Sequence, residues 1–380
     1  MSPSAENDVV LPEAADLVLT DLFIKMFKRL NLASHAYISS QYDFEVQGGT
    51  VLKPLIGSGQ VDGFTTVVQP LPQSEKGVSL SQSLYPMVSD LDTYAAAAIA
   101  IDTAVRNLLA VGTPLSQIAL LDNFCWCSSD DPERLWQLKE CVRACYETAV
   151  VYGTPFISGK DSMYNDFSGY DAFDNEVKIS VPPTILISSI GVVPDVARVH
   201  SFAFVKPGDL IYLLAAYTTA DCEFGGSEYL ALLRDQGLVV DTAAGHVPKF
   251  SPVTQLPFYH KIQEAVAAGH LRSLYPLAQG GLALAAGKGA LAEGLGFEFE
   301  ISAGERADLF LFNEQPGRFL VSIAPEMAAE LEKEFAGNGC LQLGRVREDD
   351  KIIVRQNNAI SIQTTTTDLL TAYRSTFAGF

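Results

Sequence analysis

The chain has 380 residues, a formal net charge of −19, and 48% hydrophobic residues. This charge argues against nucleic acid or an anionic membrane surface as a partner, because both require clusters of lysine and arginine. The length is more typical of two domains than of one. The sequence opens with no secretory signal pattern and contains no run of about 18 apolar residues, so we expect a cytoplasmic protein outside any membrane.

In chain order, residues 1–19 are expected to form a loose lead-in. The first clear helix is predicted between Asp92, which can cap its N-terminus, and Gly112, which can end it. A second helix is predicted between Asp131 and Gly153, with a proline in its first turn. Both helices end in a Gly-Thr-Pro sequence that leads into a strand.

The two strands that follow these helices are expected to end at Asp122 and Gly159. Two successive helix-to-strand units bring their strand ends to the same edge of a sheet, where α/β folds collect ligands. Residues 163–176 are expected to form a loop, and residues 182–194 another strand.

A domain boundary is predicted near residues 194–207, which separates a first domain of residues 20–195 from a second, α/β domain of residues 196–380. The second domain alternates between strand and helix patterns. Strands are predicted at 208–217, 317–324, 341–346 and 351–356, and helices at 224–233, 256–269 and 279–294.

The stretch "FISGKDSMYND" at 156–166 places a lysine, a carboxylate and a hydroxyl directly after an apolar run. It is not a Walker phosphate loop, because Asp161 separates Lys160 from Ser162. The residue types still suit a phosphorylated ligand: Gly159 allows close backbone approach and Lys160 supplies charge. Asp161 could reach a divalent cation, and Ser162 could donate a hydrogen bond. A solvated loop explains the same residues and is favoured on composition alone.

Two further stretches are candidates for binding. Asp122 and Asn123 could contact a base, a ribose or a metal-bound phosphate, or could form an Asx turn. The glycine pair in "YPLAQGG" could present backbone N–H groups to an anion, but Pro276 and Ala278 offer no cation, so a tight turn is favoured. The six cysteines form no C-x-x-C pair, and free thiols are expected.

From about Thr20 to its C-terminus, the chain resembles the second half of the phosphoribosylformylglycinamidine synthase family, PurL, the ATP-dependent amidotransferase of purine biosynthesis. Seven ordered stretches carry the resemblance: "YDFEVQGGTVLKPLIG", "DTYAAAAIAIDTAVRNLLAVG", "ALLDNFCW", "GTPFISGKDSMYNDF", "PPTILISSIGVVPDV", "GGSEY" and "LFNEQPGRFLVSI".

The resemblance implies an α+β fold made of one PurM-like, AIR synthase-related unit. In such a unit an N-terminal α+β domain pairs with another copy to form a barrel, and a C-terminal α/β domain follows. The family's enzyme is a carbon–nitrogen ligase: ATP activates the amide oxygen of formylglycinamide ribonucleotide, and ammonia from glutamine then yields formylglycinamidine ribonucleotide. Mg²⁺ neutralises the phosphate charge.

The resemblance also implies roles for individual residues. Asp122 and Gly159 match positions that contact ATP, and Ser162 matches a position that contacts the ribonucleotide substrate. Position 160 is a magnesium-associated asparagine in the short form of the enzyme, so Lys160 excludes direct metal ligation and is assigned to the ATP site. Asp161 is the substitute candidate for metal.

A second, auxiliary nucleotide site of the family is expected to be weak or lost here. Asp62 and Asn107 of that site are retained. Thr103 stands where the family has a glutamate, and Pro276 and Ala278 stand where it has an aspartate and a serine. Acidic ligands for Mg²⁺ are therefore missing.

The catalytic histidines of the family lie in its other half, so no catalytic residue is expected in this chain and it should be inactive alone. Its expected partners are the N-terminal half of the synthase and a glutaminase subunit or domain, with dimerisation through the N-terminal domain. The alternative is a non-catalytic, dimerising scaffold of the same superfamily. The intact "LDN" and "GKDS" stretches favour the enzyme, and "YPLAQGG" favours the scaffold.

Overall fold

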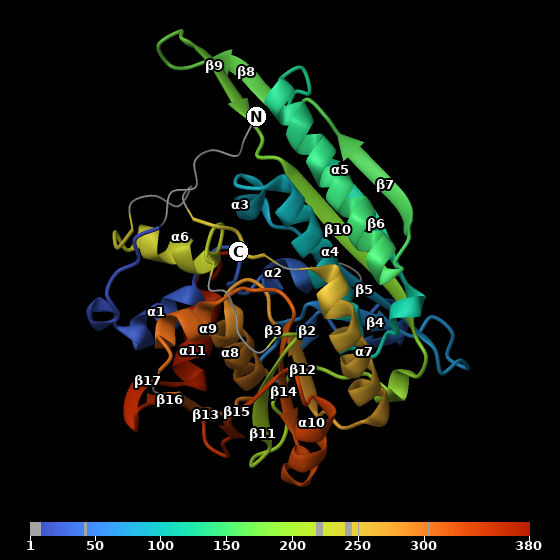
Figure 1. The fold of residues 1–380 in the computed structure, drawn as a ribbon, viewed down its shortest axis with the longest axis vertical. Helices are drawn as coiled ribbons and strands as arrows, with labels where there is room; N and C mark the ends of the chain where they lie inside the picture. Colours follow the sequence, from blue (N-terminus) through green and yellow to red (C-terminus); the bar gives the residue numbers. More distant parts are fainter. Residues whose placement is uncertain (1–8, 42–43, 218–222, 240–244, 250, 303) are drawn as a thin grey trace.

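The chain folds around two large β-sheets with helices between and around them (Figure 1). The computed structural model describes residues 9–41, 44–217, 223–239, 245–249, 251–302 and 304–380. None of the helices in these ranges is long and apolar enough to cross a membrane. Five cysteines are free thiols, and Cys222 lies outside the described residues.

The first sheet has six strands in the order β1-β4-β5-β10-β6-β7. All neighbours are antiparallel except β6 and β7, which run parallel. The strands are β1 Thr50–Leu52, β4 Thr65–Val68, β5 Gly77–Ser83, β6 Ile118–Cys125, β7 Phe156–Ser162 and β10 Thr184–Val193; a separate hairpin joins β2 Leu55–Ile56 to β3 Val61–Asp62.

The two helices predicted in the first half are confirmed. The Asp92 side chain accepts the Ala95 N–H at the start of α4 (Thr93–Ala110). Asp131 caps α5 (Pro132–Tyr152) in the same way, and Gly153 ends it in a left-handed conformation with φ 69°. Their inner faces form one apolar core with the buried side chains of β6 and β10.

Helices cover only one face of the first sheet. Along β5, Ser79 and Ser81 are buried, whereas Leu80 between them is 45% exposed. The side chains of Leu186 and Ile190 in β10 are likewise only partly covered. We call this half-exposed surface the open face.

The second sheet has seven strands in the order β12-β14-β11-β15-β13-β16-β17 and confirms all the strands predicted beyond residue 208. The strands are β11 Leu210–Ala215, β12 Ser273–Pro276, β13 Phe297–Ile301, β14 Arg318–Ile323, β15 Gly339–Val346, β16 Lys351–Gln356 and β17 Ala359–Thr365.

Helix α1, from near the N-terminus, packs against the second sheet's layer rather than the first. Helix α1 (Leu19–Met26) contacts β17, α6 (Glu228–Asp235) and α11 (Thr366–Ser375). Its Phe27 neighbour lies in the core beside Gly287 of α8. The domain limits at 20–195 and 196–380 therefore stay a prediction. The remaining helices are α1 Leu19–Met26, α2 Ala36–Ser39, α3 Pro86–Ser89, α6 Glu228–Asp235, α7 Pro252–Ala268, α8 Gly281–Glu293, α9 Ala307–Phe312, α10 Ala328–Glu334 and α11 Thr366–Ser375.

The loop predicted at 163–176 is wrong, because this segment builds most of a hairpin. β8 (Asp166–Tyr170) pairs with β9 (Glu176–Ser180), and Figure 1 shows the pair projecting from the end of the molecule. Asp171 holds the turn by accepting the N–H groups of Phe173 and Asn175. The sequence suggested a loop because Asp, Asn, Gly and Ser dominate it.

Candidate functional site

The predicted site residues lie on two adjacent parallel strands, β6 and β7. Asp122 stands opposite Gly159, and Cys125 stands opposite Ser162. The expectation that Asp122 and Gly159 meet at one place in a sheet is therefore confirmed.

The predicted ends of these strands are wrong. β6 continues past Asp122 to Cys125, and β7 continues past Gly159 to Ser162. Polar side chains are tolerated here because β7 is the edge strand and most of it is exposed to solvent. The "GKDS" sequence is thus part of a strand, and its side chains alternate between the two faces of the sheet.

This alternation separates the predicted residues into two groups. Asp122 stands beside Ile187 of β10, which is fully buried beneath the helices. Residues directly opposite each other share a face of the sheet, so Asp122 and its partner Gly159 face the helices. Lys160 and Ser162 point the other way, to the open face.

On the helix side, the Asp122 carboxylate fills the space beside Gly159. A Cβ atom at Gly159 would lie 2.6 Å from Oδ1 of Asp122, so only glycine fits there without a shift. Burial raises the pKa of the Asp122 carboxyl, while the backbone N–H of Lys160, which donates to it, opposes that rise. Asp122 therefore fixes the backbone of the edge strand.

On the open face, Lys160 and Ser162 contact each other. The Lys160 ammonium donates a hydrogen bond to the Ser162 hydroxyl, and both side chains are accessible. Asn165, which the sequence analysis missed, donates from Nδ2 to the Ser162 carbonyl at 2.8 Å. Tyr164 beside it has φ 57°, a left-handed backbone that is rare for a bulky residue. Lys160 and Ser162 therefore present an ammonium group and a hydroxyl group to the open face, and the Asn165 side chain holds the backbone at Ser162 in place.

The residues present do not by themselves make a magnesium site. Asp161 follows Gly159 by two residues, faces the helix side and is exposed. Within the described parts of the chain, no group of three or more His, Cys, Asp or Glu side chains is arranged to hold a metal ion. Asp161 as a metal ligand stays a prediction.

The remnant of the auxiliary site is engaged in internal contacts. Asp62 accepts the Tyr373 hydroxyl at 2.6 Å and the His35 N–H at 3.2 Å. The Lys288 ammonium donates to the backbone carbonyl of Asp62 at 3.2 Å. Asn107 donates to the Ser81 hydroxyl at 2.9 Å. The loss of nucleotide binding at this auxiliary site stays a prediction.

Thr103, which replaces the expected glutamate, contacts the hydroxyl of Tyr85 at 2.9 Å. The glycine pair of "YPLAQGG" forms the tight turn that was favoured, with φ 79° at Gly280. The Gly280 N–H donates to Glu314 at 2.8 Å, and Glu314 also accepts the Glu228 N–H at 3.0 Å. The Glu314 carboxyl group thus accepts the backbone N–H group that was considered for an anion.

Comparison with known proteins agrees with this architecture. Residues 67–193 match "AIR synthase related protein, N-terminal domain", and residues 206–357 match "AIR synthase related protein, C-terminal domain". Together these matches cover most of the chain.

Two curated relatives are PurL subunits of phosphoribosylformylglycinamidine synthase. The protein of Alkaliphilus metalliredigens is 30% identical over 316 residues, which are 83% of this chain and 39% of that protein. The protein of Methanococcus aeolicus is 29% identical over 367 residues, 95% of this chain and 46% of that protein. The chain thus spans less than half the length of these relatives.

The fold is also that of a solved PurL. The structure of Thermotoga maritima PurL complexed with FGAR superposes with a TM-score of 0.66 at 16% identity, covering 92% of this chain and 53% of that one. The chain therefore belongs to the family of AIR synthase related proteins, and the two curated relatives described above are PurL subunits.

Proposed function

We propose that the chain supplies one half of a phosphoribosylformylglycinamidine synthase, the half that corresponds to the C-terminal part of PurL. In this reaction ATP phosphorylates the amide oxygen of formylglycinamide ribonucleotide, and ammonia derived from glutamine displaces the phosphate. The proposal rests on the kinship with PurL and on the length of the chain, which is less than half that of its curated relatives. Structures of Thermotoga maritima PurL complexed with ADP and with ATP support ATP as the second substrate.

The open face of the first sheet is the observation that carries the proposal. Lys160 and Ser162 stand there side by side, on a surface that helices leave uncovered. A second AIR synthase-type unit packed against this face would enclose both groups and exclude water. Lys160 would then offer a point charge to a phosphate, and Ser162 a hydrogen bond to the ribonucleotide, each stronger in the drier surroundings.

Asp122 and Gly159 face the other side of the sheet, but β7 is its edge strand. A nucleotide laid along the free edge of β7 would reach both sides, and we keep ATP contact at these two positions as part of the proposal. Mg²⁺ would need ligands from the second unit in addition to Asp161, because the described residues hold no complete ligand set. The partners we propose are the N-terminal half of the synthase and a glutaminase.

The test mixes the purified chain with the N-terminal unit of a PurL and measures ATP hydrolysis that depends on formylglycinamide ribonucleotide and ammonium. Neither component alone should be active. Ser162→Ala should lower the rate at least about tenfold, a loss equivalent to one hydrogen bond to a charged group. Lys76→Ala, at an exposed lysine outside both sheets, is the control and should leave the rate unchanged.

A non-catalytic scaffold is the second candidate, and the internal contacts of Asp62 favour it. A scaffold would form the complex without substrate-dependent hydrolysis. Equal rates for Ser162→Ala and the unsubstituted chain in an active mixture would show that the open face contributes nothing to the reaction.

A further inference from the structure

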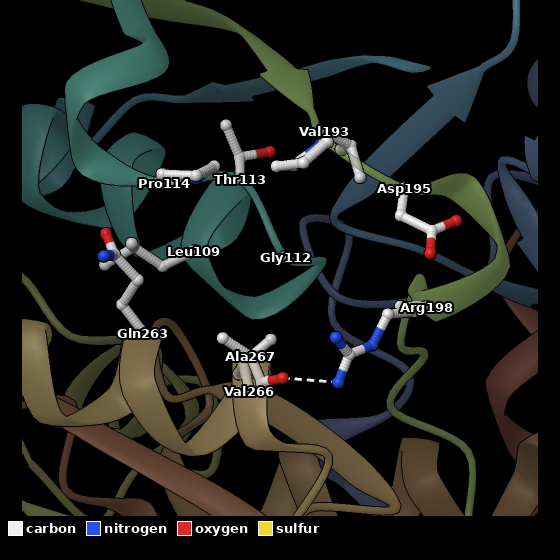
Figure 2. A pocket seen from close by; sticks show the side chains of 11 residues that line it. Leu109, Gly112, Thr113, Pro114, Val193, Asp195, Arg198, Gln263, Val266 and Ala267 are labelled. Carbon is white, nitrogen blue, oxygen red and sulfur yellow. Dashed lines mark hydrogen bonds between the residues drawn. The ribbon is translucent and has the colours of Figure 1, made fainter. Parts of the chain in front are cut away.

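A small pocket lies where helices α4 and α7 end (Figure 2). Its volume is about 200 Å³. Its lining includes Leu109, Val193, Asp195, Arg198, Val266 and Ala267.

The size and the walls of the pocket limit what fits. Pockets for drug-sized molecules begin at roughly 300 Å³, so this one suits a smaller metabolite. Leu109, Val193 and Val266 provide apolar surface on three sides (Figure 2). An apolar group of a few carbon atoms would fill the space between them.

Both charged residues of the pocket lie on the same side of it, as Figure 2 shows. Arg198 donates through Nη2 to the carbonyl of Ala267, and among the described residues it forms no ion pair. Asp195 uses Oδ1 to accept the Ala197 N–H. One short 3-10 turn, Val196–Arg198, sets the spacing of the two charged groups.

The electrostatics disfavour a ligand that carries a single charge. Helices α4 and α7 end beside the pocket at Ala110 and Ala268, and the C-terminal end of a helix is its negative end. These ends and Asp195 repel an anion, whereas Arg198 repels a cation. A molecule that carries an ammonium and a carboxylate group on the same carbon atom can pair with Asp195 and with Arg198 at once.

We propose that this pocket binds a free α-amino acid with an apolar side chain. Its carboxylate pairs with Arg198 and its ammonium with Asp195, as charge-assisted hydrogen bonds. The side chain lies between Leu109, Val193 and Val266. This site is independent of the open face and of the function proposed above.

The pocket joins parts of the chain that are far apart in sequence. Leu109 belongs to α4, Val266 belongs to α7, and Arg198 lies on the segment between the two sheets. A ligand that contacts all three stabilises the folded state over the unfolded state, so the melting temperature should rise with ligand concentration.

The experiment is calorimetric titration of the full chain with L-leucine, with 4-methylpentanoate, which lacks the ammonium, and with 3-methylbutylamine, which lacks the carboxylate. L-leucine should bind saturably, and each analogue at least about tenfold more weakly. Arg198→Gln and Asp195→Asn should each lower the affinity for L-leucine about tenfold. The asparagine at position 195 can still accept the Ala197 N–H and so keep the turn. Ala267→Trp should fill the pocket and abolish binding.

Arg345→Gln is the matched control, because this arginine is 64% exposed and lies on the second sheet. It should leave the affinity unchanged, and melting curves establish that every variant is folded. Absence of saturable binding up to about 20 mM would overturn the proposal, since that concentration exceeds a weak metabolite Kd of roughly 1 mM. Equal affinity for L-leucine and either analogue, or unchanged affinity in Arg198→Gln, would overturn it as well.

Discussion

The hydroxyl of Tyr373 donates a hydrogen bond to Oδ2 of Asp62 across 2.6 Å and thereby ties the last helix of the chain to strand β3. The two residues are separated by 311 positions in the sequence. In this fold Asp62 is therefore a structural anchor.

Replacing Tyr373 with phenylalanine should lower the free energy of unfolding by about 1–2 kcal/mol, because the half-buried Asp62 carboxylate loses a hydrogen-bond donor. Urea denaturation measures the change. Tyr170→Phe, at an exposed tyrosine of the projecting hairpin, should have no effect on the free energy of unfolding.

The auxiliary nucleotide site should be inactive, so titration with Mg²⁺-ADP should show no binding in either variant or in the parent chain. Tight binding that Asp62→Ala abolishes would show that the auxiliary site is intact.

The ion pair between Arg106 and Asp102 should contribute more to the free energy of unfolding than the hydrogen bond between Tyr373 and Asp62. The Arg106 Nε and an Asp102 oxygen are 2.7 Å apart, and the side chains are 1% and 0% exposed. Arg106 also donates to the carbonyl of Leu277 at 2.7 Å, which links α4 to the turn before α8. Arg106→Met should cost about 3–5 kcal/mol, because Asp102 would be left buried without its cation.

The control for Arg106 is Arg345→Met. Arg345 pairs with Glu298 at 2.6 Å but is 64% exposed, so its loss should cost less than about 1 kcal/mol. Urea denaturation of the two variants, measured side by side, compares their losses of unfolding free energy. Similar losses in both would mean that burial does not set the strength of the Arg106 pair.

Glu314 should make stability depend on pH. Burial raises the pKa of its carboxyl to about 8 from an ordinary 4.5, although the N–H groups of Gly280 and Glu228 oppose this rise, and the nearby Arg29 opposes it too. The folded state therefore holds a proton that the unfolded state releases above pH 4.5. This contribution to stability is complete below pH 4.5 and is lost as the pH rises to about 8.

The slope of this loss is at most about 1.4 kcal/mol per pH unit. Glu314→Gln keeps the acceptor for both N–H groups but cannot ionise, so its stability should change less between pH 5 and about 8 than that of the parent chain. Chemical denaturation at a series of pH values measures the two profiles. Parallel profiles would show that Glu314 is ionised in the folded protein.

Local signals in the sequence were sufficient for the elements that depend on local physics. Asp92 and Asp131 cap their helices as predicted, since an N-cap needs only the side chain and the next three residues. The alternation and the apolar runs likewise located β10 and four strands of the second sheet, β11, β14, β15 and β16, but not β12, β13 and β17. The α+β class itself was predicted from the resemblance to the PurL family.

The face on which each site residue lies could not be predicted. Asp122 and Lys160 follow apolar runs in the same way, yet the pairing with β10 and an irregularity in register near Leu121 place them on opposite faces. The hairpin β8–β9 was missed because its turn depends on the Asp171 side chain. The contact between Tyr373 and Asp62 joins distant segments and leaves no local signal.

The open face should receive a second AIR synthase-type unit. Leu80 lies at the centre of that face and is 45% exposed, and Leu341 on the second sheet is 41% exposed, so the two leucines form a matched pair for a charge insertion. Sedimentation velocity of the chain mixed with the N-terminal unit of a PurL measures the complex directly. We expect a complex with the parent chain and with Leu341→Lys, and its loss with Leu80→Lys. A complex that persists with Leu80→Lys and disappears with Leu341→Lys would contradict it.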